Sequence, residues 1–438
     1  MKNGSTVIVG GGVAGIQASL DLANRGLKVY LVEKTPSIGG KMALLDKTFP
    51  TMDCAICILA PKMIEVYRHP NVELLTYSEI KEVDGEAGNF KVKILRKARF
   101  IDESRCVGCG VCASKCPTKV SDEYQLGLAE RKAVYMPFTQ SVPLIYCIDS
   151  RHCLYLNKGI CRVCEKNCPA NAIDFEQKDE VIEVEASSIV ISTGLETYDP
   201  SPIKEYGYGR FKNVITAFEL ERLMTATGPT GGELLKPSDK KHPQEVVFIQ
   251  CVGSRSLDEG YPYCSSVCCM HATKEGILVK EHDSKVKVTI LYTDLRAFGK
   301  GFKDFVNRAR EEYGIEYIRG KPAEIREDPE TSRLTFWVEN TQTGEVFEKS
   351  CDILTLCTAL IPSSKNNELA KIMGIEIDKY GFFKRPDPLL SPLSTSKEGI
   401  FVCGFSQGPK DIPDSIAEAS GASALAVLTT NEKGGVVQ

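Results

Sequence analysis

The first 35 residues alternate between apolar runs and polar breaks in the manner of a strand, a helix and a second strand. Thr6–Val9 is a short β-branched run typical of a buried strand. An amphipathic stretch with Ile16, Leu20 and Leu22 follows, and the apolar run Lys28–Val32 ends at Glu33. This order predicts a βαβ unit at the start of the chain.

Two later apolar runs have the character of further strands of the same domain. Ser188–Gly194 ends in a small-residue turn, and Glu398–Gly404 precedes an Ala- and Ser-rich helix expected over 414–428. Another strand, helix and strand are expected at 245–250, 270–281 and 287–292. The pattern resembles an α/β flavoprotein with two dinucleotide-binding domains, of the thioredoxin and disulfide reductase type, whose first domain is interrupted by inserts.

The first βαβ unit carries the glycine fingerprint of a dinucleotide site. Gly10, Gly12 and Gly15 form G-x-G-x-x-G between strand and helix, and the acid Glu33 lies about twenty residues further on. Such glycines let backbone N–H groups approach a pyrophosphate, and the acid accepts from ribose hydroxyls. A glycine-rich turn without a ligand is the alternative interpretation.

A second glycine pair, in Ser37–Lys41, resembles the flavoprotein pattern and favours FAD over NAD. The expected cofactor-binding residues, some of them placed by resemblance to such domains, are Gly10, Gly12, Val13, Ala14, Gly15, Glu33, Lys34, Gly39, Gly40, Lys41, Thr193, Gly194 and Gly404.

Cysteines between 106 and 168 form two tandem runs. The first is C-x2-C-x2-C-x3-C-P, the spacing that places three thiolates on one [4Fe–4S] cube and the fourth on its neighbour, and the second is the same run with its first gap stretched to seven residues. With that crossover, the expected ligand sets are Cys106, Cys109, Cys112 and Cys168 for one cluster, and Cys153, Cys161, Cys164 and Cys116 for the other. Structural zinc or free thiols are the alternatives, but zinc sites rarely repeat a run of this kind.

The strand at 245–250 opens onto Cys251 where an NAD(P)H-binding domain needs a second glycine loop. Cys264, Cys268 and Cys269 follow, and four cysteines at a strand end and a helix start can supply one more cubane. A cysteine-rich apolar turn, or a redox disulfide such as Cys264–Cys268, would also suit the spacing.

The expected domain limits are 1–100, 178–244 and 352–438 for the three parts of the FAD-binding domain. An inserted ferredoxin domain is expected at 101–177, and a second Rossmann-like domain at 245–351.

Composition excludes several classes of function. The formal net charge of −4 over 438 residues does not suggest nucleic-acid binding, and no apolar run reaches the length of a membrane span. No signal-peptide pattern precedes Thr6, so the eighteen cysteines indicate metal sites in a reducing compartment, and we expect a cytoplasmic protein.

Several long motifs are similar to the heterodisulfide reductase family, specifically to its flavin-binding A-type subunits. They are Thr48–Lys62, Phe248–Arg255, Tyr263–Ser265 with Val267–Cys269, Leu295–Phe302 and Gly320–Ile325, and the likeness covers nearly the whole chain. It implies FAD, the two ferredoxin clusters and a third [4Fe–4S] cluster on Cys251, Cys264, Cys268 and Cys269.

The same resemblance implies that Lys274 points its ammonium towards flavin N5 and that Glu221 is a nearby acid. It also implies that Lys410, Asp411, Ile412 and Pro413 close over the isoalloxazine. From the residues alone, Lys274 would be a solvated helix position and Glu221 a surface charge. The family's longer members carry an extra N-terminal domain and a C-terminal ferredoxin module, so we expect a short form.

We therefore expect an FAD and iron–sulfur electron-transfer subunit that bifurcates or confurcates electron pairs. Its expected partners are B- and C-type subunits, a hydrogenase, formate dehydrogenase or other electron-input module, and ferredoxin, with a homodimer inside a larger assembly. The alternatives are an NAD(P)H-dependent flavin reductase, which the missing second glycine loop argues against, and a non-bifurcating wiring subunit. The terminal acceptor, the direction of flow and the role of Cys54 and Cys57 stay open at this point.

Overall fold

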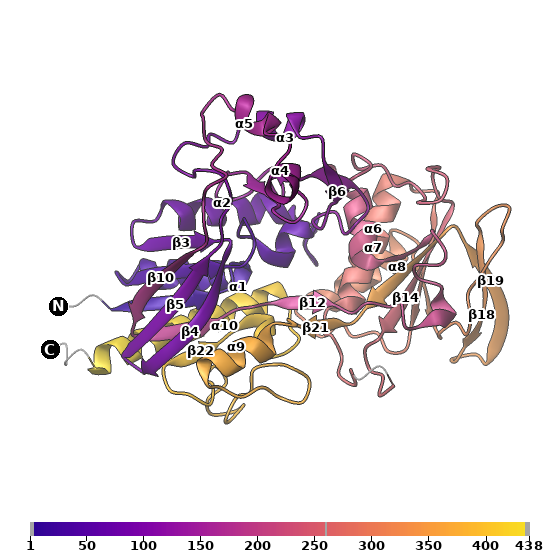
Figure 1. Ribbon diagram of the computed structural model, residues 1–438. Coiled ribbons are helices and arrows are strands. Elements are labelled where there is room, and N and C mark those ends of the chain that lie inside the picture. The colour runs from indigo at the N-terminus through magenta and orange to yellow at the C-terminus, as the bar shows by residue number, and fades with distance from the viewer. Residues whose placement is uncertain (1–3, 259–260, 434–438) are drawn as a thin grey trace. The chain divides into compact units, whose positions relative to one another are not determined.

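A computed structural model describes residues 4–258 and 261–433 (Figure 1). The chain divides into two compact units. Unit 1 comprises residues 1–43, 56–195 and 362–438, and unit 2 comprises 44–55 and 196–361. The chain passes between them after residues 43 and 55, and again within β12 (Leu195–Thr197) and β21 (Leu360–Pro362). The expected domain limits 1 and 438 lie outside the described residues.

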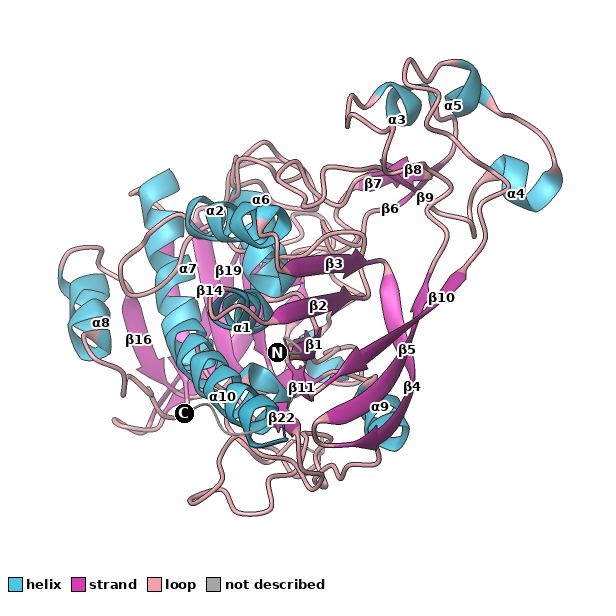
Figure 2. Ribbon diagram, turned by 90° about the vertical axis from the view of Figure 1, so that its left-hand side faces the viewer, coloured by secondary structure: helices cyan, strands magenta, loops and turns pink. Residues whose placement is uncertain are grey.

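Unit 1 is built on a five-stranded parallel sheet in the order β22-β11-β1-β2-β3. Each strand is a short run rich in Val, Ile and Leu, which suits a sheet buried on both faces. A three-stranded antiparallel sheet, β10-β5-β4, belongs to the same unit (Figure 2). The strands are β1 (Ser5–Val9), β2 (Lys28–Glu33), β3 (Val72–Thr76), β4 (Ser78–Glu86), β5 (Asn89–Arg96), β10 (Glu180–Ala186), β11 (Ser188–Ile191) and β22 (Ile400–Val402).

Helices α1 (Val13–Ala23) and α10 (Ile412–Lys433) lie side by side in unit 1. Ser423 of α10 donates to the Ala18 carbonyl, and Ser420 to Asp21, so the small residues of α10 allow a close approach. Val7, Ile189 and Val402 pack with Phe90 and Val92 into a core shared by the two sheets. The other helical segments of unit 1 outside the insert are η1 (Gly40–Leu44), α2 (Ala55–Arg68), α9 (Asn366–Met373) and η3 (Gly404–Gln407).

The insert between β5 and β10 consists of short elements. Its helices are α3 (Val111–Lys115), α4 (Leu154–Lys158) and α5 (Val163–Lys166). Its strands form two antiparallel pairs, β6 (Lys119–Ser121) with β7 (Glu130–Lys132) and β8 (Val134–Tyr135) with β9 (Cys147–Ile148).

Unit 2 contains a second five-stranded parallel sheet, β13-β20-β14-β15-β16, with α7 packed on β14, β15 and β20. Val247 and Leu354 of this sheet share a core with Leu334 and Phe336 of an antiparallel sheet, β17-β18-β19. The strands are β13 (Val214–Thr216), β14 (Glu245–Val252), β15 (Lys287–Tyr292), β16 (Glu316–Arg319), β17 (Arg326–Glu327), β18 (Leu334–Asn340), β19 (Glu345–Cys351) and β20 (Ile353–Thr358). The helical segments are η2 (Lys204–Tyr206), α6 (Ala217–Met224), α7 (Cys268–His282) and α8 (Phe302–Glu311).

The predicted fold class is confirmed: two α/β units, with a cysteine-rich insert in the first. The helices expected at 270–281 and 414–428 are present and extend to 268–282 and 412–433. Within the described part of the chain, no helix combines the length and apolar character that crossing a membrane would require.

Candidate functional site

The turn from β1 into α1 needs glycine at two positions. A Cβ on Gly10, whose φ is +110°, would lie 2.3 Å from the carbonyl oxygen of Ser192. A Cβ on Gly15 would lie 1.9 Å from the carbonyl oxygen of Gly10. Gly12 is different, because its Cβ would meet only the Gly40 Cα, at 4.0 Å. Gly12 is also the N-cap of α1 and has no side chain that could accept a hydrogen bond from the first turn. The backbone N–H groups of Val13 and Ala14 can therefore bind a phosphate at the start of the helix.

Glu33 at the end of β2 is held in place by the backbone around it. Its Oε2 accepts from Gly11 N at 2.7 Å, and its Oε1 accepts from the backbone and side chain of Thr35, both at 2.8 Å. The carboxylate retains lone pairs for ribose hydroxyls.

A hollow of about 90 Å³ adjoins Glu33, and Gly10, Lys34 and Thr193 also line it. Apolar side chains form much of its wall, namely Val9, Val32, Ile80, Leu369 and Ile372. Such a mixture of apolar wall and polar ends suits a nucleoside. No sequence motif predicted Ile80, Leu369 and Ile372, because these residues come from β4 and α9.

The second glycine pair lies against the first glycine turn. Gly39 N donates to the Gly11 carbonyl at 2.8 Å, and a Cβ on Gly40 would come 2.9 Å from Gly12 Cα. Lys41 continues from this pair into η1. The structure therefore places 10–15 and 39–41 together, as a flavin diphosphate site would need.

The remaining predicted FAD residues come from the ends of β11 and β22. Ser406 in η3 bonds to Thr193 Oγ1 at 3.2 Å and accepts from Gly194 N at 3.3 Å. Gly404 N donates to Glu418 at 2.9 Å, and Lys410 forms an ion pair with the same carboxylate. Asp411 precedes α10, and Ile412 and Pro413 begin it.

Gln407, which belongs to no predicted motif, is 5% exposed, and neither its amide nitrogen nor its amide oxygen has a partner among the described residues. A buried amide without partners is costly, so native proteins rarely keep one unless a ligand or water completes it. A flavin offers adjacent donors and acceptors that would satisfy both atoms. Together with the glycine turns, this orphaned amide fits FAD.

The inserted cysteines gather in two groups. Burial raises the pKa of Cys112 to about 12, and the neighbours that raise it further are Cys106, Cys168 and Cys164. Burial likewise raises the pKa of Cys164 to about 11, and Cys153, Cys116 and Cys161 add to the effect. Cys168 beside Cys112, and Cys116 beside Cys164, are the neighbours that the crossover of a two-cluster ferredoxin would need, although Cys164 is also near Cys112.

The seven-residue gap of the second run has a local explanation. Cys153 precedes α4, and the helix takes up the additional residues before Gly159 turns the chain at φ +68°. Cys109 and Cys161 are exposed, whereas Cys112 and Cys164 are buried. The insert has helices of only four or five residues and counts cysteines in its own core, so the chemistry of its donor set fits two cubanes that also hold the fold.

Four cysteines of unit 2 also lie together. Cys251, near the end of β14, has a φ of +58°, the left-handed region that glycine ordinarily occupies. Burial raises the pKa of Cys268, and Cys269, Cys251 and Cys264 raise it further. Cys264 and Cys268 are both free, so the alternative of a disulfide between them is not found.

Positive side chains lie near two of these four cysteines, Cys251 and Cys269. Lys321 Nζ donates to the Cys251 carbonyl at 3.1 Å, and burial lowers the pKa of Lys321 against the opposing effect of Cys251. Arg255 and Arg296 are near Cys251 and Cys269. Cations beside buried thiols favour the thiolate form that iron–sulfur clusters require, so this donor set fits a [4Fe–4S] cluster.

A buried charge cluster surrounds Lys274 on α7, where the sequence alone suggested a solvated position. The ammonium contacts Glu221 of α6, and its distance to Glu275 Oε1 is 3.0 Å. His271 Nε2 lies 2.9 Å from Glu221 Oε2. Lys274 is 1% exposed and both carboxylates are 0% exposed. The charges of these groups are therefore stabilised by one another and not by water.

The two carboxylates of this cluster ionise differently. Burial opposes the ionisation of Glu221, but Lys274 and His271 outweigh it and lower the pKa of Glu221 to about 2. Burial raises the pKa of Glu275, and the Glu221 charge raises it further, against Lys274 and His271. Two neighbouring acids with opposite shifts are typical of acid–base sites.

The other cysteines are outside the three expected ligand sets. Cys54 and Cys57 are disulfide-bonded, whereas sixteen cysteines are free. Cys147, Cys351, Cys357 and Cys403 are buried, as expected for small side chains in strand-like surroundings.

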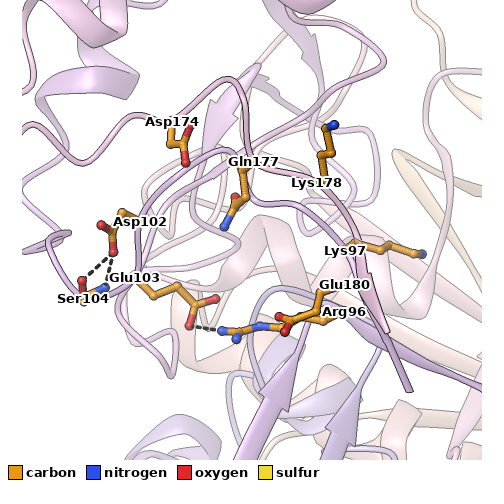
Figure 3. A pocket seen from close by; sticks show the side chains of 9 residues that line it. All are labelled: Arg96, Lys97, Asp102, Glu103, Ser104, Asp174, Gln177, Lys178 and Glu180. Atoms are coloured by element: carbon orange, nitrogen blue, oxygen red, sulfur yellow. Dashed lines mark hydrogen bonds and ion pairs between the residues drawn. The ribbon is translucent and has the colours of Figure 1, made fainter. Parts of the chain in front are cut away.

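A larger hollow, of about 360 Å³, lies in unit 1, and no predicted cofactor residue lines it (Figure 3). Its lining is polar, with Arg96 paired to Glu103 and Ser104 bonded to Asp102. Because it has neither apolar walls nor cysteines, we assign it no cofactor.

Comparisons with known proteins agree with this geometry. Residues 6–47 match the family described as FAD dependent oxidoreductase, and residues 99–120 match the 4Fe-4S binding domain. Two solved thioredoxin reductases, from Lactococcus lactis and T. acidophilum, have TM-scores of 0.53 and 0.52 at 17% and 15% identity. Each comparison covers 98% of this chain, with 99% and 98% of the respective reductase.

Curated relatives are much more similar in sequence. The iron-sulfur A-type subunit of the CoB--CoM heterodisulfide reductase of Methanocaldococcus jannaschii is 52% identical over 419 residues, which is 96% of this chain and 63% of the relative. One of two corresponding A-type subunits of Methanopyrus kandleri is 50% identical over 432 residues, 98% of this chain and 64% of the relative. The chain thus spans somewhat less than two thirds of the length of these relatives.

Fold, glycine turns and cysteine groups together define an iron–sulfur flavoprotein with a thioredoxin reductase-like architecture and an inserted ferredoxin domain. Over the residues that align, the chain is similar to heterodisulfide reductase A-type subunits, at 49–52% identity.

Proposed function

We propose that this chain binds one FAD and three [4Fe–4S] clusters and transfers electrons within a heterodisulfide reductase-like complex, splitting electron pairs between two acceptors or merging them. The observation that carries the proposal is Cys251 in a glycine conformation near the end of β14, grouped with Cys264, Cys268 and Cys269. Cysteine side chains thus gather at the strand end where a pyridine-nucleotide domain would bind pyrophosphate.

The proposed FAD site uses the residues predicted from sequence, together with Gln407. Gly10, Gly12 and Gly15 give the diphosphate its space, Glu33 accepts from the ribose, and Thr193, Gly194, Gly404 and 410–413 border the remainder. Bound FAD would supply the exchange between paired and single electrons, since cubanes carry one electron at a time.

The catalytic roles of Lys274 and Glu221 are part of this proposal. Their support is that unit 2 buries a permanent ammonium beside an ionised carboxylate. Such a cation favours a negatively charged reduced cofactor.

The partner set is also proposed from the relatives. One relative, from Methanothermobacter thermautotrophicus, is named as the A-type subunit of an H(2):CoB-CoM heterodisulfide,ferredoxin reductase, and it is 49% identical. Its name contains both a heterodisulfide and ferredoxin, and these two would be the acceptors of a bifurcating complex. We propose that the partners are B- and C-type subunits, ferredoxin and an input module such as a hydrogenase or formate dehydrogenase. We also propose that the chain forms a homodimer and is located in the cytoplasm. The five domain segments defined from sequence remain part of this proposal.

Anaerobic cofactor analysis of the purified chain tests the cluster count. We expect about twelve irons and one FAD per chain, and Cys268→Ser should lose about four irons and keep the FAD. Cys351→Ser is the matched control, because Cys351 is a buried free cysteine outside the cysteine groups. About eight irons in the unaltered chain would contradict the third cluster.

Two redox measurements separate the proposal from its rivals. NADH and NADPH should fail to bleach the bound flavin anaerobically, whereas a pyridine-nucleotide reductase would be bleached. A potentiometric titration should show strongly crossed one-electron flavin potentials, and ordinary uncrossed potentials would instead indicate a non-bifurcating wiring subunit.

A further inference from the structure

Arg255 lies beside the group of four cysteines in unit 2. Its backbone N–H donates to the Tyr263 carbonyl at 3.0 Å, and its side chain is 25% exposed. The hydrogen bond to Asp294 is the main cause of the raised pKa of Arg255, and the Cys251 thiol raises this pKa further through its charge and a side-chain contact. The guanidinium is therefore next to one of the four proposed cluster ligands.

Asp294 fixes the direction of this guanidinium. Arg255 Nη2 donates to Asp294 Oδ2 at 2.7 Å. The carbonyl oxygen of Asp294 also lies 3.6 Å from the sulfur of Cys269, a second proposed ligand. Because the guanidinium is rigid and planar, holding Nη2 also sets the direction in which Nη1 points.

The other terminal nitrogen of Arg255, Nη1, is buried and has no hydrogen-bond partner among the described residues. A buried N–H group without an acceptor is costly, because it has lost its water and gained no bond in return. Cys251, Cys264, Cys268 and Cys269 are all free, and a cluster bound by them would bring several sulfur atoms that can accept N–H hydrogen bonds. The unpaired donor thus suits a cysteine-bound cluster.

The other cations near these cysteines are placed differently. Lys321 Nζ already donates to the Cys251 carbonyl at 3.1 Å. Arg296 is exposed, and a hydrogen bond from its backbone is its larger effect on Cys269. Arg255 therefore combines a positive charge with a buried N–H group that has no acceptor.

The cysteines of the insert provide a comparison within the same chain. Burial has the largest effect on the pKa of Cys112 and Cys164, a backbone N–H group acts next, and the remaining main contributors are other cysteines. No cationic side chain is among these contributors. A change at Arg255 should therefore leave the two insert clusters unaffected.

We propose that Arg255 donates a hydrogen bond from Nη1 to a sulfur atom of the third [4Fe–4S] cluster and thereby raises the reduction potential of that cluster. A reduced cluster carries one more negative charge than an oxidised one, so a cationic donor stabilises the reduced form more. Hydrogen bonds to sulfur are among the factors that set cluster potentials. The inference rests on the third cluster of the proposed function.

An anaerobic redox titration of the whole chain, followed by electron paramagnetic resonance, tests this role. The signal of the third cluster is the one that Cys268→Ser removes. Arg255→Gln should keep the iron content and lower the midpoint potential of this signal. The expected change in the reduced-to-oxidised ratio at a fixed potential is at least about tenfold, which corresponds to about 59 mV for a one-electron couple. The insert clusters should keep their midpoints, which a merely structural role of Arg255 would not predict to differ from the third.

Arg308→Gln is the matched control for this titration. Arg308 lies on α8 in unit 2 and also forms an ion pair with a carboxylate, that of Glu312. It is not among the groups that act on the four cysteines, so all midpoints should stay unchanged in this variant.

Arg255→Lys separates the hydrogen bond from the charge. A lysine keeps the positive charge and can pair with Asp294, but it has no second nitrogen that could reach the cluster. We expect a shift in the same direction as in Arg255→Gln, but a smaller one. An unchanged midpoint in Arg255→Lys beside a lowered one in Arg255→Gln would show that charge alone acts, and would overturn the hydrogen bond.

An unchanged midpoint in iron-replete Arg255→Gln overturns the whole inference. If Arg255→Gln loses iron, Arg255→Lys decides: a lowered midpoint supports the hydrogen bond, and an unchanged one overturns it. If the unaltered chain holds only about eight irons, or Cys268→Ser removes no signal, the third cluster of the proposed function fails instead. The two failures are therefore distinguishable.

Discussion

The Lys274 ammonium and the Glu221 carboxylate form an ion pair that is sealed from solvent, with side-chain exposures of 1% and 0%. Both partners belong to unit 2, one on α7 and the other on α6. Each group would be strongly disfavoured at its position without the other, because a buried unpaired charge loses its hydration with nothing in return.

Lys274→Met should therefore destabilise unit 2 by about 3–5 kcal/mol, the typical effect of removing one partner of a buried pair. The double variant Lys274→Met with Glu221→Gln should recover more than half of this loss, since it leaves no uncompensated charge. Trp337, the single tryptophan of the chain, lies on β18 in unit 2, so its fluorescence during urea unfolding measures this unit. Arg326→Met, also in unit 2, breaks a solvent-exposed pair with Glu324 and should cost less than about 1 kcal/mol.

Acid should weaken unit 2 through Glu221. Its pKa is lowered from 4.5 to about 2 in the folded state, so its contribution is complete above the unfolded value and disappears as pH falls through the folded one. The contribution amounts to about 3 kcal/mol, lost between about pH 5 and pH 2. Glu275, with its raised pKa, contributes no such loss. Stability measured by Trp337 fluorescence should therefore fall less steeply in Glu221→Gln, and equal slopes would contradict the assignment.

Gly12→Ala should separate cofactor binding from folding. The new methyl group has room in the protein, because its nearest neighbour is 4.0 Å away, but it projects from the turn at which the diphosphate is expected. We expect a folded protein with its full iron content and an FAD affinity at least about tenfold weaker, measured by equilibrium dialysis of the flavin. Gln17→Ala, on the same helix α1, is the control and should bind FAD normally. Gly10→Ala should instead damage the fold, since its methyl group would lie 2.3 Å from Ser192 O.

Gln407→Leu should have opposite effects on the empty and the flavin-loaded protein. Removing two unpaired buried polar atoms should raise the thermal midpoint of the flavin-free form, by an amount equivalent to about 1–3 kcal/mol. The same change removes the donor and acceptor that we assign to the cofactor, so FAD affinity should fall. Calorimetry with and without FAD measures both effects. A variant that binds FAD as tightly as the original would show that Gln407 does not contact the cofactor.

The flavin fold was predictable because its signal is local. Gly10, Gly15 and Glu33 fall within one βαβ unit, and their spacing follows from a strand, a turn and a helix. The cysteine runs were equally local, and even the irregular gap after Cys153 corresponds to the short helix α4. Short-range spacing of this kind can be recognised in the sequence without knowing the tertiary structure.

The buried acid Glu275 was not predictable in this way. It follows Lys274 in an ordinary polar stretch, and its meaning depends on Glu221, which lies fifty-four positions earlier on a different helix. Gln407 was missed for a similar reason, since an orphaned amide is recognised only when all of its surroundings are known. The resemblance to a family drew attention to Lys274 and Glu221, but the structure was needed to show that their neighbours complete a charge cluster.

The order of strands in unit 1 has a consequence for biosynthesis. β11 pairs with β1 on one side and with β22 on the other, so the parallel sheet needs residues 400–402 before it is complete. The sheet of unit 2 ends with β20 at Thr358 and can assemble while the ribosome is still adding the later segments. We therefore expect the sheet of unit 1 to be completed only after the strands of unit 2 have been synthesised.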